Sequence, residues 1–179
     1  DMDQQVSKKA QSTSAVFADG RAMRGRVAGT VARGRLNADD HYYRGYRLPA
    51  DADDNTMPEY IDGFPEQVTV DRDFVARGQR QFNTFCYPCH GRDGYGNGPV
   101  NQRGGNLGDG TENMWVQPTS LHMDLLRERP DGYLYFVIDQ GVRNMPAYGS
   151  QIYVKDRWAI VAYIRALQLA EHYPYSELT

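Results

Sequence analysis

The pattern of apolar and polar positions changes near residue 70. Residues 1–70 show neither the 3.6-residue period of an amphipathic helix nor the strict alternation of a half-buried strand. After that point apolar residues recur at helical spacing, so each such segment is expected to bury one face. The expected helices span about residues 71–85, 119–128, 130–140 and 156–169.

Capping residues and one interior glycine refine these helices. Asp71 or Asp73 can cap the first helix, and Gly141 lies where a glycine would end the third. A glycine inside a helix costs about 1 kcal/mol relative to alanine, so Gly78 predicts a close crossing by another helix. Residues 100–116 are expected to form a loop. The apolar faces consist of Val75, Phe82 and Phe85 in the first helix and Ile160, Tyr163, Ile164 and Leu167 in the last.

Charge is segregated along residues 1–70. Seven arginines lie between Arg21 and Arg47, and acidic residues without any base follow from Asp51 to Glu66. Such a segment cannot build its own core, so it is either a solvated leader or an extended arm that becomes ordered on partner subunits. Aromatic residues favour the arm, because disordered tails are usually poor in them. They are Phe17, Tyr42, Tyr43, Tyr46 and Tyr60.

The overall composition limits the classes of partner. The chain of 179 residues holds 20 Lys and Arg against 23 Asp and Glu, with a pI near 5.8, so its charge gives no case for nucleic-acid binding. The longest apolar run, residues 158–164, is too short to span a bilayer. No signal peptide is recognisable, and we expect a mature or trimmed chain.

The clearest chemistry lies in the pentapeptide Cys86-Tyr87-Pro88-Cys89-His90. Two cysteines three residues apart, with a histidine directly after the second, form the attachment pattern of a c-type haem. Residues three and four apart share one face of a helix. Cys86 and Cys89 can therefore form thioethers with the two vinyl groups of a haem, while His90 becomes the proximal iron ligand.

Zinc binding and thiol redox chemistry explain this pentapeptide less well. A structural zinc site needs four ligands, yet Cys86 and Cys89 are the only cysteines and no His-x₃₋₅-His pair follows. A thioredoxin-like pair would be expected near a βαβ pattern, which the sequence lacks. We therefore expect one covalent haem c, which also supplies core volume to a chain that is only 40% hydrophobic. Such attachment implies the outer side of a bacterial plasma membrane or an equivalent compartment.

The segment that follows His90, residues 91–99, is rich in glycine. Its Gly-x-Gly pattern does not follow a strand, which argues against a dinucleotide loop. It also lacks the acidic spacing and the final glutamate of an EF-hand calcium loop. We expect these glycines to let the backbone pass close to the flat edge of the macrocycle.

A second protein ligand decides whether the iron carries electrons or binds gases and peroxide. Met145 is the best candidate, because it lies on an expected loop between two helices, far enough after His90 to return on the opposite face of the haem. Pro146 stiffens the backbone just behind it. The other candidates are Met57, Met114, Met123, His41, His122 and His172; of these, His122 and Met123 fall inside an expected helix.

Taken together, these residues resemble a class I cytochrome c over roughly residues 71–170. The resemblance implies a mainly α fold around a covalent haem, with the first and last helices crossing near Gly78. It also implies that the Pro99 carbonyl accepts a hydrogen bond from the non-ligating nitrogen of His90 and so orients the ligand. The chain then divides into an extended N-terminal arm, 1–70, and a mono-haem cytochrome c domain, 71–179. The matching residues are Gly78, Phe82, Cys86, Cys89, His90, Gly98, Pro99, Met145, Pro146, Trp158 and Tyr163.

Residues 17–24 and 29–34 of the arm resemble the mono-haem cytochrome c subunit of bacterial alternative complex III. That complex takes electrons from membrane quinol, and its subunit is similar to a lipoprotein whose lipidated cysteine would here have to precede Asp1. The resemblance implies a non-catalytic subunit on the periplasmic face of the membrane, with no small-molecule substrate. It would accept electrons from a multihaem cytochrome c and pass them to a terminal oxidase or a soluble carrier. A free electron carrier with a disordered leader, and an open-site haem domain for catalysis or gas sensing, remain the alternatives.

Overall fold

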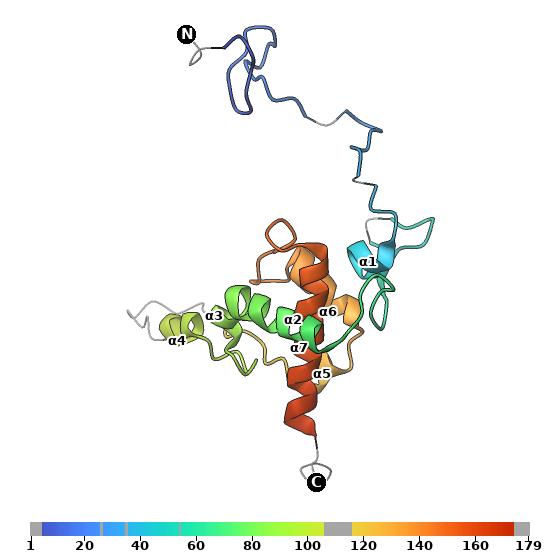
Figure 1. Ribbon diagram of the computed structural model, residues 1–179, viewed down its shortest axis with the longest axis vertical. Helices are drawn as coiled ribbons and strands as arrows, with labels where there is room; N and C mark the ends of the chain where they lie inside the picture. Colours follow the sequence, from blue (N-terminus) through green and yellow to red (C-terminus); the bar gives the residue numbers. More distant parts are fainter. Residues whose placement is uncertain (1–4, 26, 35, 54, 106–115, 174–179) are drawn as a thin grey trace. The chain divides into compact units, whose positions relative to one another are not determined.

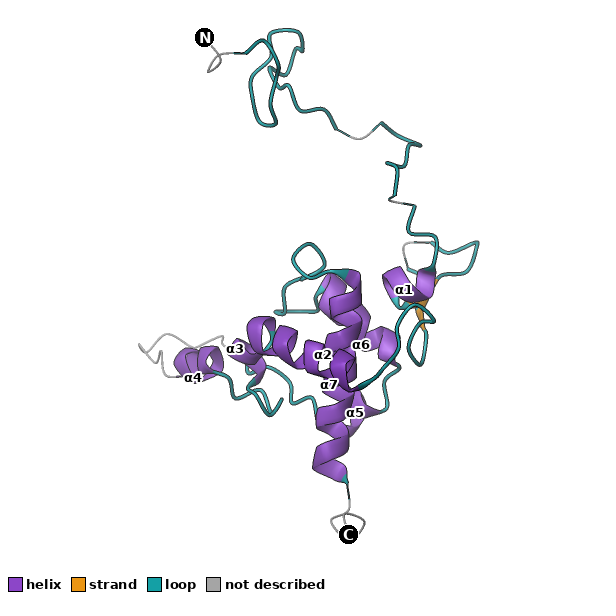
Figure 2. Cartoon of the chain, viewed as in Figure 1, coloured by secondary structure: helices purple, strands orange, loops and turns teal. Residues whose placement is uncertain are grey.

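The computed structural model describes residues 5–25, 27–34, 36–53, 55–105 and 116–173. The secondary structure is mainly helical, as Figures 1 and 2 show, which confirms the predicted fold class. The chain forms two units, Asp1–Asn37 and Ala38–Thr179. The elements are α1 (Asp40–Arg44), β1 (Tyr46–Arg47), β2 (Glu59–Tyr60), α2 (Arg72–Phe85), α3 (Tyr87–His90), α4 (Pro99–Gly105), α5 (Asp124–Arg127), α6 (Asp131–Gln140) and α7 (Val154–His172).

Helices α2 and α7 cross at Gly78 in the centre of the second unit (Figure 1). A Cβ atom at Gly78 would lie 1.8 Å from the carbonyl oxygen of Ala159, so only glycine allows this approach. Next to the crossing, the fully buried Phe82 packs on Tyr163 with ring centroids 5.3 Å apart. The predicted crossing of the first and last helices is confirmed. Asp71 caps α2, because its side chain accepts a hydrogen bond from the backbone N–H of Phe74 at 2.8 Å.

Residues 38–70 pack on the helices of the second unit, around the fully buried Trp158. The indole N–H of Trp158 donates to the backbone carbonyl of Tyr42 at 2.8 Å. The rings of His41 and Phe64 contact the indole edge-on, with centroids 5.5 and 5.9 Å away. The unit boundary therefore falls between residues 37 and 38, whereas the sequence placed it between 70 and 71.

Strands β1 and β2 connect the same segment to α6. They pair antiparallel, with Tyr46 opposite Tyr60, and the rings of both tyrosines contact Phe136 at 5.5 and 5.4 Å. The N–H of Gly132 donates to the Ile61 carbonyl at 2.9 Å. Several aromatic residues that were predicted to contact partner subunits therefore pack within the chain itself.

The first unit contains a closed loop but no helix among its described residues. Thr13 and Arg21 form an isolated antiparallel bridge, which folds residues 12–22 back on themselves. The guanidinium of Arg24 contacts both carboxylate oxygens of Asp19 at 2.7 and 2.8 Å, and it covers the ring of Phe17 at 4.2 Å. Residues 12–24 are thus held by a turn, a bridge and an ion pair, which need no helical or strand periodicity.

Several helices differ from the sequence-based prediction, which included neither α1 in the expected extended arm nor the short α3. Helix α4 lies at the start of the stretch 100–116 that was expected to be a loop, because Pro99 at its first position is preset for helix. Helix α5 is a single turn that begins at Asp124, since the Ser120 hydroxyl accepts from the His122 N–H before the helix starts. Helix α7 exceeds the predicted 156–169 at both ends. Within the described residues, no helix has the length and apolar character needed to span a membrane.

Candidate functional site

The pentapeptide lies at the junction of α2 and α3, where one helical turn gathers its functional side chains. Cys86 ends α2 and precedes α3, and its carbonyl accepts from the N–H groups of Cys89 at 3.1 Å and His90 at 2.9 Å. Pro88 is tolerated in this first turn because its missing N–H would have no partner there. Neither cysteine forms a disulfide. Both thiols and the imidazole thus belong to a single turn.

Burial sets the protonation of the thiol and the imidazole. Burial is the larger cause, and the neighbouring Cys89 the smaller, that raises the pKa of the Cys86 thiol to about 12. The thiol is therefore protonated at neutral pH. Desolvation lowers the pKa of His90, against the opposing effect of a hydrogen bond to the Thr119 backbone. Nδ1 of His90 is buried and has no hydrogen-bond partner among the described residues. A neutral imidazole is the form that ligates metal ions.

The glycine-rich loop after His90 folds back on the pentapeptide. The N–H of Gly96 donates to the His90 carbonyl at 2.8 Å. A Cβ atom at Gly96 would lie 2.0 Å from the carbonyl oxygen of Pro118, and one at Gly98 would lie 2.5 Å from that of Pro88. Close backbone carbonyls therefore require glycine at these two positions.

Met145 lies on the loop between α6 and α7, as predicted, and this loop contacts the end of α2. Met145 itself is half-buried. Three residues later, the ring of Tyr148 packs on Phe85 with centroids 6.3 Å apart. Burial raises the pKa of Tyr148, and the nearby thiols of Cys89 and Cys86 raise it further. The fold therefore brings the loop that carries Met145 to the turn that carries the cysteines.

The other candidates for a second ligand have different surroundings. Met57 is 80% exposed, and Met123 is the N-cap of α5 instead of lying inside a helix. Met114 lies outside the described residues. Each histidine candidate places a ring nitrogen against a backbone carbonyl: His41 against Gly63 (3.1 Å), His122 against Asp93 (2.6 Å) and His172 against Gln168 (2.9 Å). Met145 keeps its position as the preferred candidate.

Pro99 as the residue that orients His90 stays a prediction, and Thr119 is a neighbour of His90 that the sequence did not indicate. Pro99 opens α4, is exposed, and makes no hydrogen bond to Nδ1 of His90 in this structure. The backbone of Thr119 is near the His90 ring and opposes the lowering of its pKa. Sequence analysis considered Thr119 only as a helix cap, because nothing local shows that the chain returns to His90 there. Tyr148 was also missed, although it lies in the same short loop segment as Met145.

These residues fit a haem c. Cys86 and Cys89 offer two thiols on one turn, which is the spacing that the two vinyl groups need. His90 offers a neutral imidazole with a buried nitrogen that has no hydrogen-bond partner in the described part of the chain. Phe85 and Tyr148 provide aromatic walls beside the thiols. Each donor is therefore available to the group that the sequence predicts.

Comparison with known proteins gives one family match that covers more than half of the chain. The family model described as cytochrome c oxidase, cbb3-type, subunit III matches residues 73–164, just over half of the chain. Among solved structures, a chain of the reducing HAO-like protein complex Kustc0457/Kustc0458 of Kuenenia stuttgartiensis is similar, with a TM-score of 0.47 and 19% sequence identity. The similarity covers 63% of this chain and 52% of that one, so this chain spans about half of its length. No curated protein matches.

The matched range includes the cysteine turn, Pro99 and Met145. It also includes the crossing at Gly78 and most of the core around Trp158. A domain of this kind implies covalently bound haem c and haem-based electron transfer. The chain therefore belongs to the cytochrome c family that the cbb3-type subunit III model describes, and its helical unit is a class I cytochrome c.

Proposed function

We propose that this chain is the mono-haem electron-transfer subunit of a quinol-oxidising complex of the alternative complex III type. The observation that carries the electron-transfer part is the meeting of the cysteine turn and the Met145 loop at Tyr148. When bound, the haem supplies an iron that takes up and releases one electron. Two protein ligands leave the iron no open position for gases or peroxide, which separates a carrier from a catalytic haem.

The residues of the chain have distinct roles in this proposal. Cys86 and Cys89 would hold the haem covalently, and His90 and Met145 would ligate its iron. Met and His ligation raises the reduction potential, which suits a late position in a respiratory chain. Phe85 and Tyr148, whose rings pack on each other near the two thiols, would exclude water from this side of the site.

The first unit supports attachment to partner proteins. Its described part exposes many apolar side chains. Patches of exposed apolar surface mark interaction sites. Redox partners usually meet through interfaces below about 1,200 Å² and dissociate easily, so a haem domain needs a further contact to stay in one place. The exposed residues are Val6, Val16, Phe17, Met23, Val27, Val31 and Leu36.

The proposed location of the subunit is the periplasmic face of the cytoplasmic membrane. There the subunit accepts electrons from a multihaem cytochrome c and passes them to a terminal oxidase or a soluble carrier. A lipidated cysteine upstream of Asp1 would add a second attachment. The basis for this part is the resemblance of residues 17–24 and 29–34 to the mono-haem subunit of that complex.

Haem staining, purification from native membranes and carbon monoxide binding test the proposal. The double variant Cys86→Ala/Cys89→Ala is expected to lose the haem-stained band on a denaturing gel that the parent chain shows; a stained band in the variant refutes covalent attachment. Purification from native membranes, with identification of the copurifying subunits and a redox titration, tests the complex. Recovery of the chain as a soluble monomer at full yield would favour a free carrier. Ready binding of carbon monoxide by the reduced wild type would favour an open-site haem.

A further inference from the structure

The loop that carries Met145 contains a tight turn at its beginning. It begins at Gly141, where a Cβ atom would lie 2.5 Å from the Met145 carbonyl oxygen. A tight turn follows, in which Val142 and Met145 exchange backbone hydrogen bonds of 2.9 and 3.0 Å. Arg143 inside this turn has φ near +50°, a conformation that side chains other than glycine seldom adopt. A turn of this kind does not fix its own position relative to the helices.

One buried side chain joins the far end of this loop to both flanking helices. Arg157 of α7 is 7% exposed. Its Nε donates to the Ile152 carbonyl at 2.9 Å and its Nη2 to the Gly149 carbonyl at 2.8 Å, so it holds the loop at two points. Its Nη1 donates to the Tyr135 hydroxyl at 2.7 Å and to the Asp139 carboxylate, both on α6.

The loop also rests directly on the last turn of α6. The N–H of Gly149 donates to the Asp139 carbonyl at 3.1 Å, and the N–H of Tyr148 donates to the Ile138 carbonyl at 3.0 Å. A Cβ atom at Gly149 would lie 2.3 Å from the Asp139 carboxylate, so the backbone packs flush against the ion pair. The guanidinium is planar and directs its donors in fixed directions, which a lysine cannot reproduce. Arg157 therefore acts together with these backbone bonds to hold the loop between α6 and α7.

We propose that Arg157 is a positioning residue that holds the Met145 loop and thereby keeps Met145 on the haem iron. This inference rests on the proposed function, because it requires Met145 to be the second ligand. Arg157 touches neither ligand. It acts through Gly149 and Ile152, the two loop residues whose carbonyls it binds.

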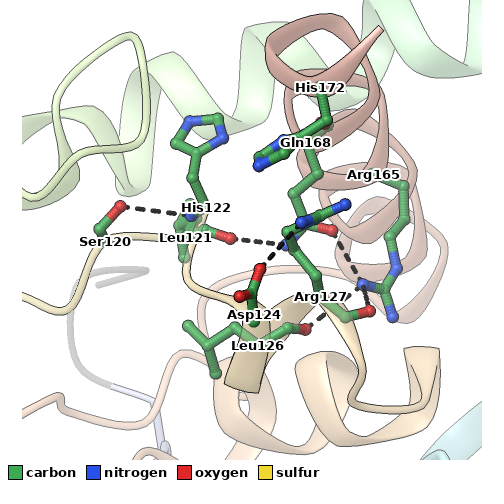
Figure 3. A network of polar contacts seen from close by, with 9 residues as sticks. All are labelled: Ser120, Leu121, His122, Asp124, Leu126, Arg127, Arg165, Gln168 and His172. Atoms are coloured by element: carbon green, nitrogen blue, oxygen red, sulfur yellow. Dashed lines mark hydrogen bonds and ion pairs between the residues drawn. The ribbon is translucent and has the colours of Figure 1, made fainter.

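Arg165, also on α7, provides a matched control (Figure 3). Its guanidinium binds the backbone carbonyls of Leu126 and Arg127 at 3.4 and 3.1 Å. It is also paired with Asp131. It also donates to the side chain of Gln168 at 2.8 Å (Figure 3). Both arginines thus combine an aspartate with backbone carbonyls. Only Arg157 contacts the loop of Met145.

The test compares Arg157→Lys with Arg165→Lys in the haem-loaded full chain. Lysine keeps a positive charge beside the aspartate in each case, so neither variant leaves a buried carboxylate without a partner. We expect Arg157→Lys to weaken the sulfur-to-iron charge-transfer band of the oxidised protein and to lower the reduction potential. Carbon monoxide affinity of the reduced protein should rise roughly tenfold to hundredfold, the factor that corresponds to losing one hydrogen bond from a charged donor. Arg165→Lys should lower the melting temperature and leave all three readouts unchanged.

A second variant approaches the same contact from the loop. Gly149→Ala retains Arg157 but places a Cβ atom against the Asp139 carboxylate, so it should shift the three readouts in the same direction even if Arg157→Lys does not fold. Wild-type readouts in both Arg157→Lys and Gly149→Ala would overturn the positioning role and leave Met145 ligation intact. Equal changes in Arg157→Lys and Arg165→Lys would also overturn it, because general destabilisation would explain them. A wild type that lacks the sulfur band and binds carbon monoxide readily would overturn Met145 ligation, and this inference with it.

Discussion

The helix crossing at Gly78 offers the sharpest test of the fold. An alanine Cβ at this position would lie 1.8 Å from the Ala159 carbonyl oxygen and 2.5 Å from its carbonyl carbon, whereas real Cβ contacts stay beyond 3.0 Å. The nearest atoms belong to the backbone of α7, so no side chain can rotate away. Helices α2 and α7 must separate by about 1 Å or more, which disturbs the packing of Phe82 on Tyr163.

The expected cost follows from two opposing effects. Overpacking of a core costs about 1–3 kcal/mol, and the better helix propensity of alanine returns about 1 kcal/mol. Gly78→Ala should therefore destabilise the chain by up to about 2 kcal/mol, and Gly78→Leu by about 3 kcal/mol or more. In a chain of this length each kcal/mol corresponds to about 2–4 °C in Tm, so Gly78→Leu should melt roughly 6–12 °C lower.

Thermal unfolding followed by circular dichroism, on haem-loaded protein, measures this effect. Gly25→Ala is the control, since a Cβ atom at Gly25 meets nothing within 4 Å; its Tm should match that of the wild type. An unchanged Tm in Gly78→Leu, with the haem spectrum retained, would show that α2 and α7 do not touch at this residue and would refute the crossing.

The remaining predictions concern the N-terminal segment and its contacts. Deleting residues 1–37 should leave the haem spectrum and Tm nearly unchanged but release the cytochrome from its membrane complex. Deleting residues 1–66 should also lower the Tm, because this deletion removes contacts to Trp158. Trp158→Phe should cost about 1–3 kcal/mol in chemical denaturation, since the Tyr42 carbonyl loses its donor. The pKa of Asp39 is lowered, chiefly by the hydrogen bond from the Tyr42 N–H. The Asp39 carboxylate therefore stabilises the fold fully at pH values above its ordinary pKa. This stabilisation is lost as the pH falls through the lowered pKa. Asp39→Asn should therefore be less stable than the wild type at neutral pH and equally stable in strong acid.

Each of these predictions has a contradicting result. Equal melting temperatures for the two deletions would mean that residues 38–66 do not pack on the helices. A chain without residues 1–37 that still copurifies stoichiometrically would make the first unit a leader, provided that any lipid anchor has been removed. Faster hydrogen exchange near Tyr42 should accompany Trp158→Phe, and its absence would contradict the indole bond. A stability difference between wild type and Asp39→Asn that is independent of pH would exclude a role for the carboxylate charge.

The local features of this cytochrome were accessible from the sequence alone. The Cys86–His90 turn, the cap of α2 at Asp71 and the end of α6 at Gly141 each depend on residues within a few positions of one another. Gly78 was informative as well, because a glycine inside a helix is costly unless another backbone needs the space. Such signals depend on sterics and hydrogen bonding within one or two turns. They can therefore be recognised from neighbouring residues in the sequence.

Other features were decided only when distant segments met. The unit boundary at residue 37 depends on the bond between Trp158 and Tyr42, which are 116 positions apart. Thr119 at the His90 ring and Arg157 on the Met145 loop likewise have no local pattern, because each acts on a partner that another element brings near. A charged residue in a helix usually faces solvent, and only packing between α6 and α7 shows that Arg157 is buried and binds backbone carbonyls. Periodicity reports which face of a segment is apolar, but the identity of the segment that covers this face is a property of the tertiary structure.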